Sequence, residues 1–406
     1  MNFLATIYTA ALLATLPVVV AGVASFALRR AGAEARSLVW RSAIAALLVV
    51  FIGRQQPQHW IALVVPSAIA APLVELGRAS MMVSGAPAIA ASGGHDASPG
   101  VPVTVAIARG LMFVYVVGFG AVLLPTVMFS IRARRRTTRL AEVADAEWLR
   151  VLETVRAEAG VMRSVRLYVD DDLATVPMTW GLRRPIVVLP SAALEWSESQ
   201  RRIVLLHELT HVRAGDWAFK VAARVVCALY WFHPGAWWIA RNLRDDCELS
   251  CDDRVIAAGV RRSDYAELLV TAAERLRGEA PVEAVALSSR GGLRARLAAV
   301  LDVSHRSRPV RREWVVVSAV ATLALVCPAS AVQLAPTRDV LTTLMRDTRW
   351  ESRAYAVIGL AQRADSIADA RIAAEGDPSP RVRAWARYAL GETITRPDST
   401  SVVRDH

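Results

Sequence analysis

Two histidines lie four residues apart in the stretch LLHELTHVRAGDW, Leu205 to Trp217, and a glutamate follows the first directly. Residues four apart share one face of a helix about one turn apart, so the imidazoles of His207 and His211 can bind one tetrahedral zinc ion. Glu208 lies beside them, where it can accept a proton from a water whose pKa the metal lowers to about 7. The spacing alone also arises by chance on polar helices, so zinc needs a third ligand.

A second helical segment offers that ligand. It begins at Pro234, with His233 before it as a helix cap or packing residue, and continues through NLRDDCELSCDDRVIAAG, Asn242 to Gly259. Glu248 and Asp252 are four apart on one face of it. We expect Glu248 to be the third ligand and Asp252 to hydrogen-bond the free N–H of a ligating histidine, which fixes its tautomer. Three protein ligands with one position left for water indicate a catalytic Zn²⁺ site, since structural zinc is normally closed by four.

Cys247 and Cys251 on the same segment are rivals for the third position. Two thiolates with two histidines would close the site and leave Glu208 without a role, so we expect small buried cysteines that pack the helix. The chain has four cysteines, too few and too clustered for a disulfide framework.

Short strands and a helix must position these residues. Arg166 to Val169 and Ile186 to Leu189 are bounded by turn residues and are typical of strands. Ser197 followed by Gln200 forms a capping box, which predicts that the helix with the two histidines begins there.

The composition indicates a membrane protein: 54% of the 406 residues are hydrophobic and the mean hydropathy is +0.33. A spanning helix needs about 20 apolar residues. Four stretches are candidates, and the first lacks the basic start of a cleaved signal peptide and reads as a retained span. They are Phe3 to Leu28, roughly Leu38 to Gly53, about Gly110 to Ile131, and Trp314 to Val332.

Arginine clusters orient these spans, because basic residues near span ends stay in the cytoplasm. The clusters lie between spans one and two, after span three and before span four, all on one side. This predicts an extracytoplasmic N-terminus, an extracytoplasmic loop from Arg54 to Ile107, and a cytoplasmic domain from Arg139 to Arg312. Within the loop, Trp60 to Val74 is expected to be re-entrant or interfacial. The net charge of +11 is concentrated at span ends and lacks aromatic interleaving, which disfavours direct nucleic-acid binding.

The C-terminal tail contains an internal repeat. DTRWESRAYAVIGLA, Asp347 to Ala361, aligns without gaps with DPSPRVRAWARYALG, Asp377 to Gly391. Such helical repeats stack faces that one unit cannot bury alone, and the pattern resembles HEAT repeats. We expect a small extracytoplasmic helical module over Asp339 to Glu392; a plain two-helix hairpin without a binding role is the alternative.

Taken together, these residues resemble the BlaR/MecR-type integral-membrane zinc metallopeptidases, the antirepressor sensor-transducers of beta-lactam resistance. The resemblance rests on four spans with the protease between the third and fourth, and on four motifs in order. These are VPMTWGLRRPIVVLP (Val176 to Pro190), HELTHVRAGD (His207 to Asp216), WFHPGAWW (Trp231 to Trp238) and CELSCDDRV (Cys247 to Val255). It implies a gluzincin-type fold in which His207, His211 and Glu248 bind Zn²⁺ and Glu208 is the general base. It also suggests that the strand Ile186 to Leu189 lines the cleft, where an extended peptide could add.

The chain departs from those antirepressors after Val332. They carry a large penicillin-binding sensor domain there, whereas this tail has no S-x-x-K or K-T-G elements. Beta-lactam sensing is therefore not expected.

The predicted fold class is a mainly α membrane protein: four transmembrane helices, a cytoplasmic α+β gluzincin-type zinc metalloprotease domain and a HEAT-like repeat module. The predicted domains are the three-span region 1–138, the protease domain 139–312, the fourth span 313–332 and the extracytoplasmic tail 333–406.

The leading hypothesis is a multi-pass zinc endopeptidase of the cell membrane. It would cleave a cytoplasmic protein, by resemblance a transcriptional repressor, or itself within Gly278 to Arg312, in response to an extracytoplasmic protein or ligand at the tail. One alternative is a receptor or scaffold with structural zinc and no proteolysis, and another is a quality-control protease of the membrane without a sensor role.

Overall fold

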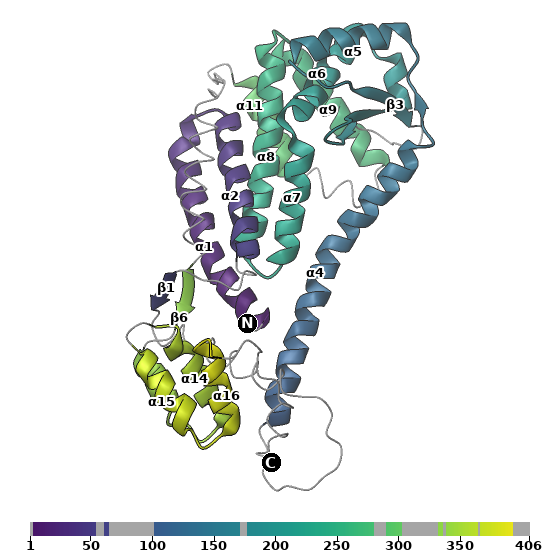
Figure 1. The fold of residues 1–406 in the computed structure, drawn as a ribbon. Helices are drawn as coiled ribbons and strands as arrows, with labels where there is room; N and C mark the ends of the chain where they lie inside the picture. The colour runs from purple at the N-terminus through teal and green to yellow at the C-terminus, as the bar shows by residue number, and fades with distance from the viewer. Residues whose placement is uncertain are drawn as a thin grey trace. The chain divides into compact units, whose positions relative to one another are not determined.

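The computed structural model describes residues 3–53, 61–64, 101–170, 177–279, 290–302, 332–335, 338–363 and 366–392. They form two compact units (Figure 1). The larger unit comprises Thr15–Leu48 and Gly118–Ala324, and the smaller comprises Met1–Ala14, Val49–Val117 and Leu325–His406. Each unit is described by itself below.

Three helices of the described residues are long and apolar enough to cross a membrane. They lie within α1 (Phe3–Ala27), α2 (Ala33–Gly53) and α4 (Val101–Thr137). Helix α2 begins five residues earlier than the predicted span at Leu38. Its first turns carry Glu34 and Arg36, whose charges are paired with Arg254 and Asp246. The predicted fourth span, Trp314 to Val332, lies outside the described residues except for Val332.

The sheet of the larger unit has the strand order β2-β3-β5-β4. The two predicted strands are confirmed as β3 (Arg166–Asp170) and β5 (Ile186–Pro190), which pair in parallel at the centre of the sheet. Strand β2 (Ala141–Glu142) runs antiparallel to β3, and β4 (Met178–Trp180) runs antiparallel to β5. All five residues of β5 are buried, as its run of β-branched residues requires.

Helices pack on this sheet and enclose one hydrophobic core. They are α5 (Ala146–Glu158), α6 (Glu198–Ala214), α8 (Pro234–Ala257), α9 (Arg262–Glu279) and α11 (Arg290–Leu301). Trp148 of α5, Leu189 of β5, and Leu205 and Leu209 of α6 are fully buried in that core. Burial of the apolar face of α6 fixes the orientation of the opposite face, which carries the histidines.

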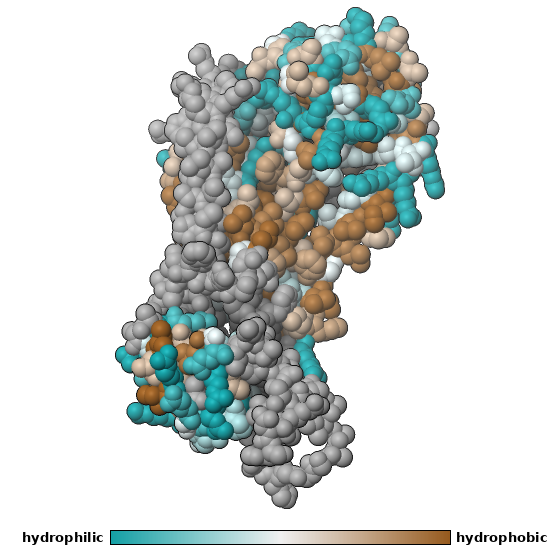
Figure 2. All heavy atoms as spheres, in the orientation of Figure 1, coloured by the Kyte–Doolittle hydropathy of each residue, from teal (hydrophilic) through white to brown (hydrophobic). Residues whose placement is uncertain are grey.

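Helices α7 (Asp216–Leu229) and α8 form a hairpin against the membrane-type helices. The Tyr230 hydroxyl donates to the Leu47 carbonyl of α2 at 3.1 Å, and Trp238 meets Trp40 edge to face at 5.0 Å. A side chain at Gly118 of α4 would lie 2.3 Å from the Trp231 ring, so this approach requires glycine. Figure 2 shows hydrophobic residues gathered over α4 and α7, and many hydrophilic residues around the sheet.

The smaller unit contains the repeat tail. Helices α13 (Arg338–Leu344), α14 (Trp350–Ala361), α15 (Ile367–Gly376) and α16 (Pro380–Ala389) pack around Leu341, Val357 and Val382. In the same unit β1 (Ile61–Val64) pairs in parallel with β6 (Val332–Ala335). The described part of the predicted interfacial piece, Trp60 to Val74, is therefore a strand.

The sequence repeat recurs as contacts in the tail. Arg353 donates to the Asp347 carbonyl at 2.8 Å, and Arg383, its counterpart in the second repeat, donates to the Asp377 carbonyl at 2.6 Å. Arg353 alone of this pair also binds a carboxylate, with its Nε and Nη2 at 2.9 and 3.2 Å from Asp377. The ion pair between Arg353 and Asp377 therefore connects the two repeats.

Replacing Arg353 by methionine is expected to loosen the tail, because it leaves the Asp377 carboxylate, 8% exposed, without its charged partner. Breaking such a pair costs about 3 kcal/mol. Hydrogen exchange of α14 and α16 amides in the full chain should accelerate by about 100-fold. Arg383→Met is the matched control, since it removes only bonds to carbonyls; equal acceleration in both variants would contradict the role of the ion pair.

Candidate functional site

Helix α6 presents His207 and His211 side by side, with ring centroids 4.9 Å apart. The predicted capping box is confirmed: the Gln200 amide donates to Ser197 Oγ at 3.3 Å, and the Ser197 amide donates to Gln200 Oε1 at 3.0 Å. The helix ends at Gly215, whose φ of +68° is a left-handed conformation that glycine adopts without strain. The caps therefore set the length of the helix that carries both histidines.

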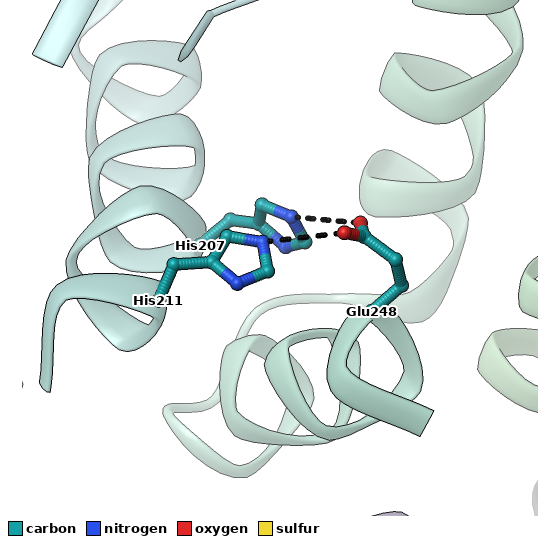
Figure 3. Close-up of side chains that lie close together, drawn as sticks. All are labelled: His207, His211 and Glu248. Atoms are coloured by element: carbon teal, nitrogen blue, oxygen red, sulfur yellow. Dashed lines mark ion pairs between the residues drawn. The ribbon is translucent and has the colours of Figure 1, made fainter. Parts of the chain in front are cut away.

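Glu248 of α8 faces both imidazoles, as predicted (Figure 3). Its Oε1 lies 3.5 Å from His211 Nε2, and its Oε2 lies 3.6 Å from His207 Nε2. The ligand atoms of the three residues all lie within 4.8 Å of one another. Two atoms bound at about 2.0–2.1 Å to one tetrahedral zinc are about 3.3–3.4 Å apart, so this donor set fits a zinc ion with little rearrangement.

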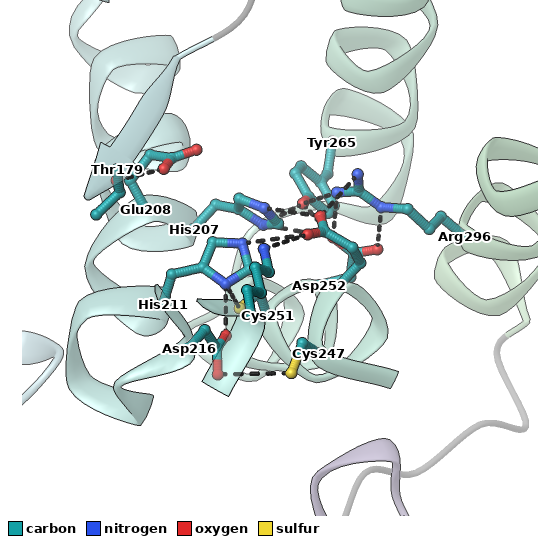
Figure 4. A network of polar contacts seen from close by, with 12 residues as sticks. Thr179, His207, Glu208, His211, Asp216, Cys247, Cys251, Asp252, Tyr265 and Arg296 are labelled. Carbon is teal, nitrogen blue, oxygen red and sulfur yellow. Dashed lines mark hydrogen bonds and ion pairs between the residues drawn. The ribbon is translucent and has the colours of Figure 1, made fainter. Parts of the chain in front are cut away.

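The Nδ1 side of His207 rests on a buried polar cluster (Figure 4). The Tyr265 hydroxyl is 3.0 Å from His207 Nδ1 and donates to Asp252 Oδ1 at 2.5 Å, while Asp252 itself is 3.4 Å from that nitrogen. Arg296 donates to both Asp252 oxygens, at 2.7 and 2.8 Å. Asp252 thus lies behind the histidine as predicted, but it accepts its hydrogen bonds from Tyr265 and Arg296, neither of which was predicted to take part.

The Nδ1 side of His211 meets a different carboxylate. Asp216 Oδ2 is 2.6 Å from His211 Nδ1, and Asp216 is 1% exposed. Burial alone would raise the pKa of this carboxyl, but the hydrogen bond with His211 and the charges of Arg41 and Lys220 hold it below the usual value. Asp216 was missed as a functional residue, although it stands five positions after His211 in the motif and opens α7.

The rival cysteines lie on this same side, away from the Nε2 atoms. Cys251 Sγ is 3.3 Å from His211 Nδ1, and Cys247 Sγ is 3.5 Å from Asp216. Burial raises the pKa of Cys247 to about 12 and that of Cys251 well above its ordinary value. Both are therefore thiols at neutral pH and pack the helix.

Positive groups surround Glu248. Lys220 Nζ donates to its Oε1 and Arg296 Nη1 pairs with its Oε2, each at 3.2 Å. Burial would raise the pKa of Glu248, but Lys220, the two histidines and Arg296 hold it well below the usual range. Burial lowers the pKa of His207, yet its hydrogen bond to Glu248 leaves it raised. A metal ion that binds His207 must displace the proton of its imidazolium form, so metal affinity falls as the pH drops.

Glu208 follows His207 on α6 and is 7% exposed. The Thr179 hydroxyl of β4 donates to its Oε2 at 2.5 Å (Figure 4). This bond holds the carboxylate beside the sheet edge, and sequence reasoning had not assigned Thr179 a role.

The position of β4 corrects one expectation. Strand β5, which was expected to accept an extended peptide, is paired on both sides, with β3 and β4. In the part of the chain that the structure describes, the strand with an unpaired edge next to Glu208 is β4. The reason is that Met178–Trp180 folds back antiparallel on Ile186–Val188.

The chain is similar to known peptidase-family and regulatory proteins. A family model described as BlaR1 peptidase M56 matches residues 3–300. The regulatory protein BlaR1 of Bacillus licheniformis is 28% identical over 143 residues, which are 35% of this chain and 24% of that protein. The methicillin resistance mecR1 protein of Staphylococcus aureus is 35% identical over 82 residues, 20% of this chain and 14% of that protein. The matched stretches thus span about a quarter or less of these relatives.

Proposed function

Because the chain belongs to the BlaR1 peptidase M56 family, we propose that it is a membrane-bound zinc endopeptidase. The observation that carries the proposal is the convergence of His207 Nε2, His211 Nε2 and the Glu248 carboxylate, with Glu208 next to His207 on α6. Its test has two parts, the zinc content of the purified protein and the loss of cleavage in Glu208→Gln.

In this proposal His207, His211 and Glu248 would hold the ion. Zn²⁺, when bound, supplies Lewis-acid activation of a water and of the scissile carbonyl. Glu208 takes the proton of the attacking water and passes it to the leaving amine. The Tyr265–Asp252 pair and Asp216 hold the two imidazoles in the tautomer that leaves Nε2 free for the metal.

The substrate is proposed to bind as an extended peptide along β4. The unpaired edge of this strand offers main-chain groups, and Thr179 within it touches Glu208, which would place a scissile bond near the general base. This binding mode relies on hydrogen bonds to the main chain of the substrate, so it suits an unfolded or loop segment of a protein.

The topology and signalling role are part of the proposal. Arginines 132, 134, 135, 136 and 139 at the end of the third span support a cytoplasmic location for the zinc site. The names of the relatives, a regulatory protein and a methicillin resistance protein, support a role in regulation. The substrate would then be a cytoplasmic protein such as a transcriptional repressor, and the HEAT-like tail would meet an extracytoplasmic protein or ligand.

Thr179→Val is expected to lower kcat by about 10-fold or more, because the Glu208 carboxylate loses a charge-assisted hydrogen bond worth about 1.5–3 kcal/mol. Thr179→Ser keeps the hydroxyl and should retain most of the rate. Cleavage rates of a peptide library by the purified variants measure this, with zinc affinity as the second readout. A loss of zinc affinity in Thr179→Val, or equal rates in both variants, would contradict the assigned role.

A further inference from the structure

The membrane-type helix α2 is fixed to α8 through buried and partly buried polar contacts. Arg36 donates from Nε and Nη2 to Asp246 Oδ1 at 3.0 and 2.7 Å, and the Trp40 indole donates to Asp246 Oδ2 at 2.8 Å. Arg254 donates to Glu34 at 2.8 Å. Asp246 and Arg254 both belong to α8, the helix that carries Glu248. These contacts fix α2 to α8.

A third attachment, by Arg41, goes to α6 and α7 instead. Arg41 Nη1 donates to the Ala214 carbonyl, the last residue of α6, at 2.8 Å, and its Nη2 pairs with Asp216 Oδ1, the first residue of α7. The guanidinium also lies over the Phe219 ring, 4.9 Å from its centroid. Arg41 therefore spans the junction at which the helix with the histidines ends.

Asp216 is shared between Arg41 and a candidate metal ligand. Its Oδ1 pairs with Arg41, and its Oδ2 is 2.6 Å from His211 Nδ1. A continuous chain of contacts thus leads from a residue within a candidate membrane span, Ala33–Gly53, to His211. A charged residue inside such a span usually serves function, because burial of its charge in a membrane is costly.

We propose that Arg41 is a positioning residue for the metal ligand His211, acting through Asp216. It follows that a displacement of α2 relative to α6 would change zinc affinity. This inference rests on the proposed zinc function.

The physical reason is that Asp216 has two oxygens, one facing Arg41 and the other facing His211. With Arg41 on Oδ1, Oδ2 is left to face His211 and to hold its Nδ1 proton. Without Arg41, the carboxylate is free to rotate, and the Ala214 carbonyl at the end of α6 loses a donor. Loss of a partner behind a metal-ligating histidine typically weakens metal binding by about 10–100-fold.

Arg36 provides a matched control on the same helix. Its partner Asp246 is also buried, at 7% exposure, so Arg36→Met breaks a comparable ion pair between α2 and α8. The hydrogen bonds of Asp246 in the described chain go to Arg36 and Trp40 and reach none of the three candidate ligands. A general effect of loosened α2 packing would therefore affect both variants alike.

The experiment measures Zn²⁺ affinity of the full chain in lipid nanodiscs by competition with a chelating indicator, and the visible spectrum of the Co²⁺-loaded protein. Arg41→Met should bind zinc about 10-fold more weakly and show an altered Co²⁺ spectrum. Arg36→Met should stay within about 2-fold of wild type, on the same reasoning. Arg41→Lys keeps the charge but lacks the planar fork, so it should lie between wild type and Arg41→Met.

The outcomes separate the two proposals. Wild-type affinity in Arg41→Met, or an equal loss in Arg36→Met, overturns the positioning role while leaving the zinc site intact. Absence of zinc binding in wild type overturns the proposed function itself and this inference with it. If Arg41→Met does not fold, Arg41→Lys tests the same proposal. An unchanged zinc affinity and Co²⁺ spectrum in Arg41→Lys would contradict the positioning role of Arg41.

Discussion

Replacing Glu248 by alanine is expected to weaken zinc binding by more than 100-fold. Loss of an outer partner of a ligand already costs about 10–100-fold, and Glu248 is proposed to contact the ion itself. The variant also leaves Lys220 and Arg296 facing the vacated position without the carboxylate that both now contact at 3.2 Å. Their positive charges then oppose a cation, which adds to the loss. Competition with a chelating indicator measures the affinity.

Asp245→Ala is the control for this prediction. It removes an acidic residue three positions earlier on the same helix, where the side chain is exposed. Its zinc affinity should match that of wild type. If Glu248→Ala binds zinc as tightly as Asp245→Ala does, the third ligand is assigned wrongly, and the group of His211, Asp216 and Cys251 would become the alternative.

Replacing Glu208 by glutamine is expected to lower the cleavage rate by about 10²–10⁴-fold while zinc affinity stays near that of wild type. The amide keeps the size of the side chain but cannot accept the proton of water, which removes general-base catalysis. Mass spectrometry of a peptide library incubated with the purified protein measures the rate, and the metal content of the same sample measures the zinc.

Glu198→Gln makes the same chemical change in the first turn of the same helix. Glu198 is exposed and pairs only weakly with Arg150, at 3.3 Å, so its cleavage rate should equal that of wild type. A Glu208→Gln protein that cleaves as fast as the Glu198→Gln protein would rule out Glu208 as the base.

The sequence allowed the elements that carry the site to be predicted, because their signals are local. The capping box at Ser197 marks the start of α6, and the four-residue spacing puts two imidazoles on one face. The same spacing on α8 identified Glu248 and Asp252. Pro234, with His233 as its N-cap, correctly marked the start of that helix.

The groups behind the ligands could not be predicted, because they come from distant parts of the chain. Tyr265 and Arg296 lie on α9 and α11, and only the packing of these helices brings them to Asp252. Arg41 is 175 positions away from Asp216. The sequence shows Arg41 only as an arginine in a short apolar stretch, which does not reveal its partner. The ion pairs in the first turns of α2 likewise join residues that no local pattern connects.

The unpaired sheet edge was missed for a related reason. Met178–Trp180 is three residues long and lies in the stretch between the predicted strands, so no alternation of polar and apolar residues marks it. Its pairing with β5 takes the place that the peptide was expected to occupy and moves the proposed substrate edge to Thr179.

The proposed activity is cleavage of a cytoplasmic protein at a zinc site whose base is Glu208. The most direct test compares protein N-termini in cells that make wild type or Glu208→Gln at equal levels. We expect new N-termini of cytoplasmic proteins, or of the chain itself, in cells that make wild type and not in cells that make Glu208→Gln. Identical sets of N-termini in both cells, with zinc bound in both proteins, would contradict it.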